Sequence, residues 1–511
     1  MLTFLLSLFN APCTFHIFAP TFEAATPPFW CARPQHLPNL PVDLWKNISG
    51  VVQIDSGKEN YDPCQMKDLN YSGTFLELID WSALTEGNIP CQKWEYDTST
   101  YGDTIVTEWD LVCGRKQLSN LAEMMFLLGV AIGGLVSGLI SDRFGRKRTL
   151  MISLLAQVIL GTMVAMTPWY LFYLILRGVL GFFCVSIVFS GFVLCVELVG
   201  GKWLTISGVS YLFPLPLSYI AISGIAYYIK GWREFQLVIT LPAASFLCFW
   251  WILPESPRWL LTAGKVDKVM TVLEEASRFN KKELPPNTDK ILKQSVSKMH
   301  AEQSQRKVGL MDLFKTPKIR KISLTLYVVW FMVYIVYYGL VLNLSNLGGD
   351  VYLNSIISGA VEFPAIAVSI LFLLKLGRRW PLCLTTAGAG IACLLTIPCP
   401  KDDYGWLTIT FAMIGKFCVS SSNVVMPVFT AELFPTFMRN LGVGSSNIPG
   451  GIALMLVPYL WNLAGMNVNM PMGILGVCGI VGGLSVLLLP ETGKGGTLAD
   501  TLEEIEETPK S

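Results

Sequence analysis

The sequence has few charged residues. Asp, Glu, Lys and Arg make up 15% of its 511 residues, whereas a soluble chain carries about a quarter. Hydrophobic residues make up 52%. They gather in runs of about 20 residues, the length that a helix needs to cross roughly 30 Å of hydrocarbon. The sequence therefore excludes a soluble globular protein and predicts an all-α integral membrane protein with many spans.

Histidine is scarce as well, because the chain holds only His16, His36 and His300. Zinc sites and Ser-His-Asp hydrolases draw on histidine, so the sequence has little material for either. It also lacks the Gly-x-x-x-x-Gly-Lys-Ser/Thr loop that binds ATP phosphates. We therefore expect no metal, no cofactor and no enzymatic activity. A net charge of +1 gives no indication of nucleic-acid binding.

A charged turn at residues 138–148 orients the chain. It lies between the apolar runs 118–140 and 149–166 and holds Asp142, Arg143 and several further cations. Because hydrocarbon excludes unsatisfied backbone groups, the turn belongs at the membrane surface. Its excess of Lys and Arg places it on the cytoplasmic side.

The number of apolar runs predicts twelve spans with both termini in the cytoplasm. Residues 1–22 are interpreted as the first span rather than a signal peptide, because they lack a positively charged start. Five more runs precede the hydrophilic segment 257–321, and six follow it. That segment has more Lys and Arg than Asp and Glu, so it is expected to be a cytoplasmic linker.

Short motifs recur in the two sets of six runs. Gly145-Arg-Lys matches Gly377-Arg-Arg, 232 residues later (377 minus 145), and Glu197-Leu matches Glu432-Leu, 235 residues later (432 minus 197). Such repeats indicate two halves related by an axis along the membrane normal, with a substrate site between them near the midplane. We therefore predict one half at 1–256 and the other at 322–511.

The segment 24–116 is predicted to be a large exoplasmic loop. It is polar and contains the glycosylation sequons at Asn47 and Asn70. It also contains four cysteines, Cys31, Cys64, Cys91 and Cys113. Four cysteines outside the cell indicate two disulfides, for which three pairings are possible.

Two charged residues fall near the middle of predicted spans in the second half. They are Glu362 and Lys416, and each costs roughly 2.5–3.5 kcal/mol to insert at a helix centre. One interpretation is that they line the central cavity and attract an organic ion. The alternative is that they pair with each other and have a structural role.

Aromatic residues form one face of the predicted seventh span. Trp330, Tyr334, Tyr337 and Tyr338 are spaced i, i+4, i+7 and i+8, as on one side of a helix. Aromatic rings bind organic cations, although ordinary helix packing or an interface belt also explains them. The other candidates for substrate contact that the residues suggest are Tyr211, Asn423 and Asn447.

Several segments resemble those of known transporters. Residues 138–147, Gly-x-x-x-Asp-Arg-x-Gly-Arg-Lys, match the loop motif of the major facilitator superfamily. Four more resemble the organic ion transporters, solute carrier family 22: Cys91-Gln-Lys-Trp-Glu-Tyr-Asp97, Thr104-Ile-Val-Thr-Glu-Trp-Asp-Leu-Val-Cys113, Pro254-Glu-Ser-Pro-Arg258 and Ala431-Glu-Leu-Phe-Pro-Thr-Phe-Met-Arg439. The resemblance implies a plasma-membrane carrier of small organic cations, anions or zwitterions that works by alternating access. We expect a monomer.

The resemblance also implies roles for individual residues. It pairs Cys31 with Cys91 and Cys64 with Cys113, and it adds Phe192 to the substrate contacts. It places a latch that joins the two halves in the outward-open state at their cytoplasmic helix ends. The gating residues are Asp142, Arg143, Arg146, Glu197, Glu255, Arg258, Glu432 and Arg439.

Departures from the family pattern leave two alternatives open. Leu374 replaces the acidic residue of the second loop motif, and Gly451 stands where a charged residue often reports substrate charge. A non-transporting receptor or orphan relative would tolerate such losses. A hexose-type facilitator is the other alternative, but the cysteine-bearing loop disfavours it.

Overall fold

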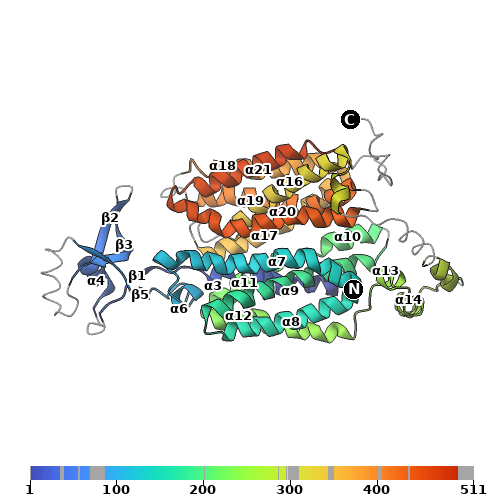
Figure 1. Ribbon diagram of the computed structural model, residues 1–511, viewed down its shortest axis with the longest axis horizontal. Helices are drawn as coiled ribbons and strands as arrows, with labels where there is room; N and C mark the ends of the chain where they lie inside the picture. Colours follow the sequence, from blue (N-terminus) through green and yellow to red (C-terminus); the bar gives the residue numbers. More distant parts are fainter. Residues whose placement is uncertain are drawn as a thin grey trace.

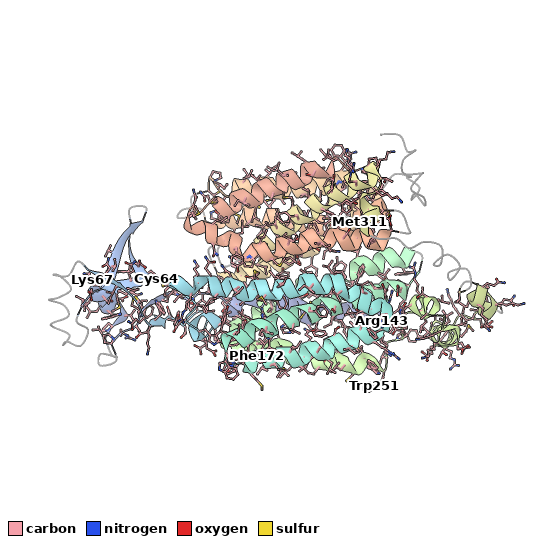
Figure 2. All side chains as sticks on the ribbon, viewed as in Figure 1. Cys64, Lys67, Arg143, Phe172, Trp251 and Met311 are labelled. Atoms are coloured by element: carbon pink, nitrogen blue, oxygen red, sulfur yellow. A yellow bond between two sulfur atoms is a disulfide. The ribbon has the colours of Figure 1, made fainter. Side chains whose placement is uncertain are left out.

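The computed structural model describes residues 2–34, 40–55, 58–69, 87–200, 202–285, 287–294, 296, 310–342, 350–399, 405–434 and 438–492. Two helical bundles lie side by side, with a small lobe at one end and short helices at the other (Figure 1). Arg143 and Trp251 lie at the end opposite the lobe residues Cys64 and Lys67 (Figure 2). The two predicted membrane faces therefore lie at opposite ends of the long axis of the bundles.

The first bundle contains residues of the N-terminal half. Its elements are α1 (Leu2–Leu8), α2 (Asn10–Phe18), α3 (Pro20–Glu23), α7 (Lys116–Phe144), α8 (Arg146–Met166), α9 (Tyr170–Glu197), α10 (Lys202–Ser210), α11 (Pro214–Tyr228), α12 (Trp232–Thr240) and the 3-10 helix η2 (Leu241–Trp250). Pro20 and Pro214 begin α3 and α11, where the missing proline N–H leaves no helical hydrogen bond unmade.

The second bundle contains the C-terminal half. Its elements are η3 (Leu310–Phe314), α16 (Pro317–Val341), α17 (Val351–Lys375), α18 (Arg379–Leu395), α19 (Gly405–Leu433), α20 (Arg439–Leu460), η5 (Trp461–Gly465) and α21 (Met470–Val486). Pro364 and Pro427 lie inside α17 and α19, and both helices continue through them.

The described residues include nine helical segments that are long and apolar enough to cross a membrane. The first, Leu2–Glu23, combines α1, α2 and α3. Two shorter apolar helices, α18 and α21, pack against each other in the second bundle. The predicted helical membrane fold is therefore present. The nine long segments and the two shorter helices reach the predicted twelve crossings only if α12 and η2 together form one more.

Glycines allow the closest helix contacts within each bundle. A Cβ atom on Gly129 of α7 would lie 1.8 Å from the carbonyl oxygen of Gly178 in α9, and one on Gly479 of α21 would lie 2.6 Å from the Cα of Gly390 in α18. No side chain fits at such distances. Because lipid provides no hydrophobic drive between helices, small residues stabilise these pairs by letting the backbones approach.

The lobe is a disulfide-linked β structure within residues 24–116. It contains β1 (Phe29–Cys31) antiparallel to β5 (Trp94–Tyr96), a second sheet of β2 (Gly50–Asp55), β3 (Lys58–Lys67) and β4 (Asn88–Pro90), and the helices α4 (Val42–Ser49), α6 (Ile105–Glu108) and η1 (Cys113–Arg115). The expectation of a large loop did not anticipate these strands.

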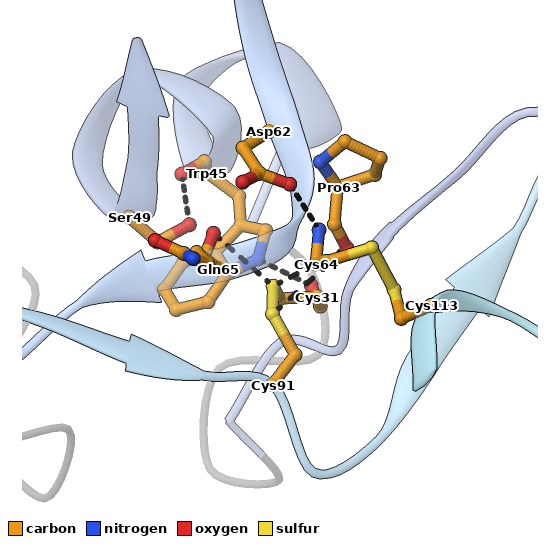
Figure 3. The surroundings of a disulfide bond; sticks show 9 residues. All are labelled: Cys31, Trp45, Ser49, Asp62, Pro63, Cys64, Gln65, Cys91 and Cys113. Atoms are coloured by element: carbon orange, nitrogen blue, oxygen red, sulfur yellow. Dashed lines mark hydrogen bonds between the residues drawn. A yellow bond between two sulfur atoms is a disulfide. The ribbon is translucent and has the colours of Figure 1, made fainter. Parts of the chain in front are cut away.

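Two disulfides connect the lobe (Figure 3). They join Cys31 to Cys91 and Cys64 to Cys113, which is the pairing that the resemblance implies. The buried Trp45 indole of α4 donates a hydrogen bond to the Cys31 carbonyl over 2.8 Å. This hydrogen bond links α4 to the strand that carries the Cys31–Cys91 disulfide.

The sequons lie in the lobe. Asn47 is exposed on α4, and its side-chain oxygen accepts a hydrogen bond from the Tyr61 hydroxyl. Asn70 lies outside the described residues.

At the opposite end of the molecule, α13 (Pro257–Thr262) packs against α14 (Val266–Asn280) through Trp259, Leu260 and Val269. These two helices belong to the segment 257–321 that the sequence predicts to be the linker.

Candidate functional site

The two charged residues predicted inside the membrane contact each other. Glu362 of α17 and Lys416 of α19 form an ion pair with 3.5 Å between Oε1 and Nζ, and their side chains are 3% and 1% exposed. The Tyr337 hydroxyl donates to the same carboxylate oxygen over 2.8 Å. Lys416 also donates to the Ser358 hydroxyl. Both charges are therefore removed from solvent and held by neighbours from three helices.

A tyrosine from the other half completes this cluster. The ring of Tyr219 in α11 lies under the ammonium of Lys416, 4.3 Å from its centre. Phe18 of α2 packs on the same tyrosine, with 3.8 Å between ring centres. We call Tyr219, Tyr337, Ser358, Glu362 and Lys416 the central cluster.

The central cluster lies where the halves touch. A Cβ atom on Gly359 of α17 would be 2.8 Å from the Tyr219 Cβ, so α11 and α17 cross closely there. One turn away, the Ser223 hydroxyl of α11 donates to the Ser355 hydroxyl of α17 over 2.7 Å. The sequence carried no signal for Tyr219, because an aromatic residue in an apolar helix does not reveal its partner.

The aromatic face of α16 divides between two roles. Rings contact in series, with centres 5.2 Å apart for Trp330 and Tyr334, 5.7 Å for Tyr334 and Tyr338, and 5.0 Å for Tyr338 and Tyr337. Tyr337 reaches Glu362, whereas the buried Trp330 indole donates to the Thr430 hydroxyl of α19 over 3.0 Å. Trp330 therefore packs inside the second bundle.

The remaining candidates for substrate contact lie elsewhere. Tyr211 packs with Leu150 in a separate hydrophobic cluster of the first bundle, and its hydroxyl donates to the Val188 carbonyl. Phe192 contacts the Tyr211 ring and is 38% exposed.

The two asparagine candidates belong to the second bundle. Asn423 is half-buried in α19. Asn447 donates to the Val443 carbonyl within α20, over 3.0 Å. Their substrate contacts, like those of Tyr211 and Phe192, remain predictions.

The predicted gating residues of the first half interact with one another. Arg146 lies 2.7 Å from Asp142 and 3.2 Å from Glu197. Glu255 accepts a hydrogen bond from the backbone N–H of Lys147. These contacts close the ends of α7, α8 and α9 against the chain that enters α13.

The second half repeats this arrangement. Arg378 pairs with Glu432 at 3.0 Å, and Glu491 accepts hydrogen bonds from the backbone N–H groups of Arg378 and Arg379. Arg439 begins α20. Arg143 and Arg258 are exposed, and Arg258 belongs to α13.

Each ion pair described above therefore joins residues of one half. The resemblance implied a latch between the halves in an outward-open state. That latch stays a prediction, because in this structure the ion pairs of the two clusters each lie within one half.

At the end of the molecule that carries the lobe, hydrogen bonds join the two halves. The Asn120 amide of α7 donates to the Asn462 side-chain oxygen of η5 over 2.8 Å. The Tyr352 hydroxyl of α17 and the Lys230 ammonium both donate to the Thr100 carbonyl of the lobe, over 3.2 and 2.6 Å. Hydrogen bonds thus join the halves beside the lobe, and a buried apolar cluster of Val209, Ile366 and Val424 joins α10 to α17 and α19.

A second buried ion pair lies inside the first bundle. Arg177 of α9 and Glu23 of α3 are each 1% exposed and 3.9 Å apart. The guanidinium also lies over the Phe126 ring, 4.8 Å from its centre. Within the part of the chain that the structure describes, one buried carboxylate oxygen of Glu123 and both of Glu23 have no hydrogen-bond partner. Sequence reasoning missed Glu23, because it stands at the polar end of an apolar run.

Comparison with known proteins shows which transporters this chain resembles in sequence and in fold. Residues 89–508 match the family described as "Sugar (and other) transporter". The chain also resembles a solved structure of the major facilitator superfamily, the proton:xylose symporter XylE bound to 6-bromo-6-deoxy-D-glucose. The TM-score is 0.64, the sequence identity 18%, and the likeness covers 99% of this chain and 98% of that one.

Curated relatives are closer in sequence. The chain is 37% identical to "Organic cation transporter protein" of Drosophila melanogaster, over 96% of this chain and 88% of the relative. It is 32% identical to "Solute carrier family 22 member 2" of Homo sapiens, over 88% and 81%. It is also 32% identical to "Beta-alanine transporter" of Drosophila melanogaster, over 98% and 85%.

Two helical bundles with a buried charged cluster at their junction and this likeness in fold define a transporter of the major facilitator type, which is not an enzyme. The chain belongs to the sugar (and other) transporter family, and within it to the organic ion transporters of solute carrier family 22. The resemblance seen in the sequence motifs is thereby confirmed.

Proposed function

We propose that this protein moves small organic ions across the plasma membrane by alternating access. In this proposal it works as a monomer that crosses the membrane twelve times, with the lobe outside and both termini in the cytoplasm. The names of its relatives include organic cations and β-alanine, so they support an organic-ion substrate and leave its charge open.

The central cluster carries the proposal. Burying Glu362 and Lys416 in the membrane costs free energy. A helical membrane fold does not itself require either charge. Both face the junction of the halves, where Tyr219 of the first half contacts Lys416 of the second. A substrate bound there contacts both halves at once, so its binding energy acts on their relative position.

The contacts between the halves support an inward-facing state. Asn120 with Asn462, and Tyr352 with the Thr100 carbonyl, join the halves beside the lobe. To release substrate outward, these contacts must break. We further propose that the two cytoplasmic ion-pair clusters then meet and close the inner side, which gives the gating role to residues such as Arg146 and Glu432.

Uptake into proteoliposomes tests the proposal. The purified full-length protein is reconstituted and offered a panel of labelled organic cations, anions and zwitterions. We expect saturable uptake of at least one member, and a loss of about tenfold or more for Glu362→Gln. Glu274→Gln, an exposed site on α14, is the matched control. Absence of saturable flux for every member would favour a non-transporting receptor, and flux of hexoses alone would favour a sugar facilitator.

A further inference from the structure

One ammonium group joins three parts of the molecule at the end that carries the lobe. Lys230 lies between α11 and α12 of the first half. It donates to the Thr100 carbonyl of the lobe over 2.6 Å and to the Tyr352 hydroxyl of α17 over 3.3 Å. The Tyr352 hydroxyl in turn donates to the same carbonyl over 3.2 Å. The first half, the lobe and the second half therefore meet in one ring of three hydrogen bonds.

Aromatic rings surround this ammonium. Its Nζ atom lies 5.1 Å from the ring centre of Tyr352 and 5.5 Å from that of Tyr227 in α11. The Tyr352 ring stacks on Phe22 of α3, with 5.5 Å between the ring centres, and it meets the Tyr227 ring edge-on at 5.6 Å. A side chain of the second half thus sits between three side chains of the first half, Phe22, Tyr227 and Lys230, which we call the tyrosine socket.

The lysine of the tyrosine socket has no acidic partner. In the part of the chain that the structure describes, no carboxylate forms an ion pair with Lys230. Its ammonium is stabilised by the Thr100 carbonyl, by the Tyr352 hydroxyl and by the faces of two rings, which attract a cation. One of the rings and one of the acceptors belong to Tyr352, so the lysine loses part of its stabilisation when the second half moves away.

The lobe is attached to the first half at this point. The Trp232 backbone N–H of α12 donates to the Asp103 carbonyl over 3.0 Å, and a Cβ atom on Gly102 would lie 2.2 Å from the Lys230 carbonyl oxygen. Gly102 has φ +68°, a conformation that favours glycine. The Thr100 carbonyl is therefore fixed beside Lys230, and Tyr352 is the part of the ring of hydrogen bonds that is free to leave.

The tyrosine socket lies on the lobe side of the central cluster. On α11, Tyr227 follows Tyr219 by eight residues, and on α17, Tyr352 precedes Glu362 by ten. These intervals correspond to about 12 and 15 Å of helix. The Ser223 hydroxyl of α11, which donates to α17 over 2.7 Å, lies between the two levels. A path from the lobe side to the central cluster along these helices therefore passes the socket first.

We propose that Lys230 is a positioning residue that locks the outer gate. Its tethered ammonium holds Tyr352 in the socket and so favours the state in which the halves are joined beside the lobe. This inference rests on the alternating access of the proposed function and adds the residue that sets the balance between the two states. A neutral side chain at position 230 leaves the rings in place but removes the cation, so the outward-open state becomes more populated.

Chemical labelling behind the socket measures this population. Ser223→Cys places a thiol one turn inward from Tyr227, at a position that is buried in this structure. The full-length protein is expressed in cells, and an anionic, membrane-impermeant methanethiosulfonate is added outside. The same protein without Ser223→Cys gives the background from native cysteines such as Cys399. Removing a lysine would by itself slow an anionic reagent, so faster labelling reports opening.

Four variants in the Ser223→Cys protein make the test specific. We expect Lys230→Met to label about five times faster or more, because a cation held over aromatic rings shifts an equilibrium by a factor of about five to thirty. Lys230→Arg retains a cation and should label more slowly than Lys230→Met. Tyr352→Phe keeps the ring but loses the hydroxyl, and it should label about threefold faster than its parent. Lys93→Met, which neutralises an exposed lysine of the lobe, should label at the parent rate.

The outcomes separate this inference from the proposed function. Labelling of Lys230→Met at the parent rate or slower, in protein that reaches the cell surface, would overturn the lock even where uptake is found. Equal acceleration by Lys93→Met would overturn it as well. If Lys230→Met does not reach the surface, Tyr352→Phe decides in its place, and labelling of that variant at the parent rate would overturn the lock. Faster labelling of both variants without transport of any organic ion would support the lock, and the proposed function alone would fail.

Discussion

Removing the guanidinium of Arg177 should destabilise the first bundle. Arg177→Met retains an apolar stem of similar length but leaves Glu23 and Glu123 without their buried counter-charge. Breaking a buried ion pair by removing one partner costs about 3–5 kcal/mol. For Glu23, which forms the ion pair, the loss has a ceiling, because its carboxylate can take up a proton, which costs about 3.7 kcal/mol at pH 7 for an ordinary glutamate.

The expected change in melting temperature follows from this ceiling. With an unfolding entropy of about 2.1 cal/mol/K per residue, a loss of that size lowers the midpoint by about 3 to 7 °C, depending on whether the whole chain or one half unfolds together. Acidification should reduce the effect. Protonating the same glutamate at pH 5 costs only about 1 kcal/mol, so the variant should approach its parent as the pH falls.

Thermal unfolding of the purified protein in detergent, at pH 7 and pH 5, measures both effects. Two companion variants make the result specific. Arg177→Lys keeps the charge and should lose less than Arg177→Met. Combining Arg177→Met with Glu23→Gln and Glu123→Gln removes all three charges and should recover most of the loss, since replacing a buried pair by neutral groups is often nearly neutral.

Two results would refute this reasoning. Arg177→Met could melt with its parent at pH 7, in which case the buried pair does not stabilise the bundle. Alternatively, the triple variant could melt no higher than Arg177→Met. The guanidinium would then act through its packing on Phe126 rather than through its charge.

Three further predictions concern closure, backbone and modification. Cysteines at Asn120 and Asn462, oxidised to a disulfide, should stop uptake until they are reduced, and undiminished uptake by the cross-linked protein would contradict closure at the lobe. Gly145→Ala should cost about 1–3 kcal/mol, because Gly145 has φ +104° and a Cβ would lie 2.5 Å from Glu255 Oε2; an unchanged melting temperature would disprove this. Asn47→Gln should migrate faster on a gel after expression in eukaryotic cells, whereas equal migration would mean that Asn47 carries no glycan.

The sequence predicted those features that depend on composition along the chain. The apolar runs predicted the helices, and the recurring Gly145 and Gly377 motifs predicted two halves. Glu362 and Lys416 were found because charge stands out in an apolar run. The sequence could not show that they pair, because the pair depends on how α17 and α19 cross. Their contact with a substrate stays a prediction.

Contacts between distant helices could not be read in this way. Tyr219 reaches the central cluster because Gly359 lets α11 approach α17, and nothing in either local sequence specifies that approach. The strands of the lobe escaped notice for a related reason. β1 is three residues long and pairs with β5 more than 60 residues later, so no local alternation marks it.

The ion-pair clusters at the end of the molecule opposite the lobe differ between the two halves, and this difference leads to a prediction about gating. In each half a glycine with positive φ, Gly145 or Gly377, turns the chain so that a carboxylate caps the next helix. In each half, the contacts at the end opposite the lobe are therefore made by residues of that half. The halves differ in one respect: Arg146 pairs with Asp142 as well as Glu197, whereas the position matching Asp142 is Leu374. If the clusters meet in the outward-facing state, the first half brings the additional carboxylate. Asp142→Asn should therefore slow turnover while substrate affinity stays the same. Unchanged turnover would exclude this role.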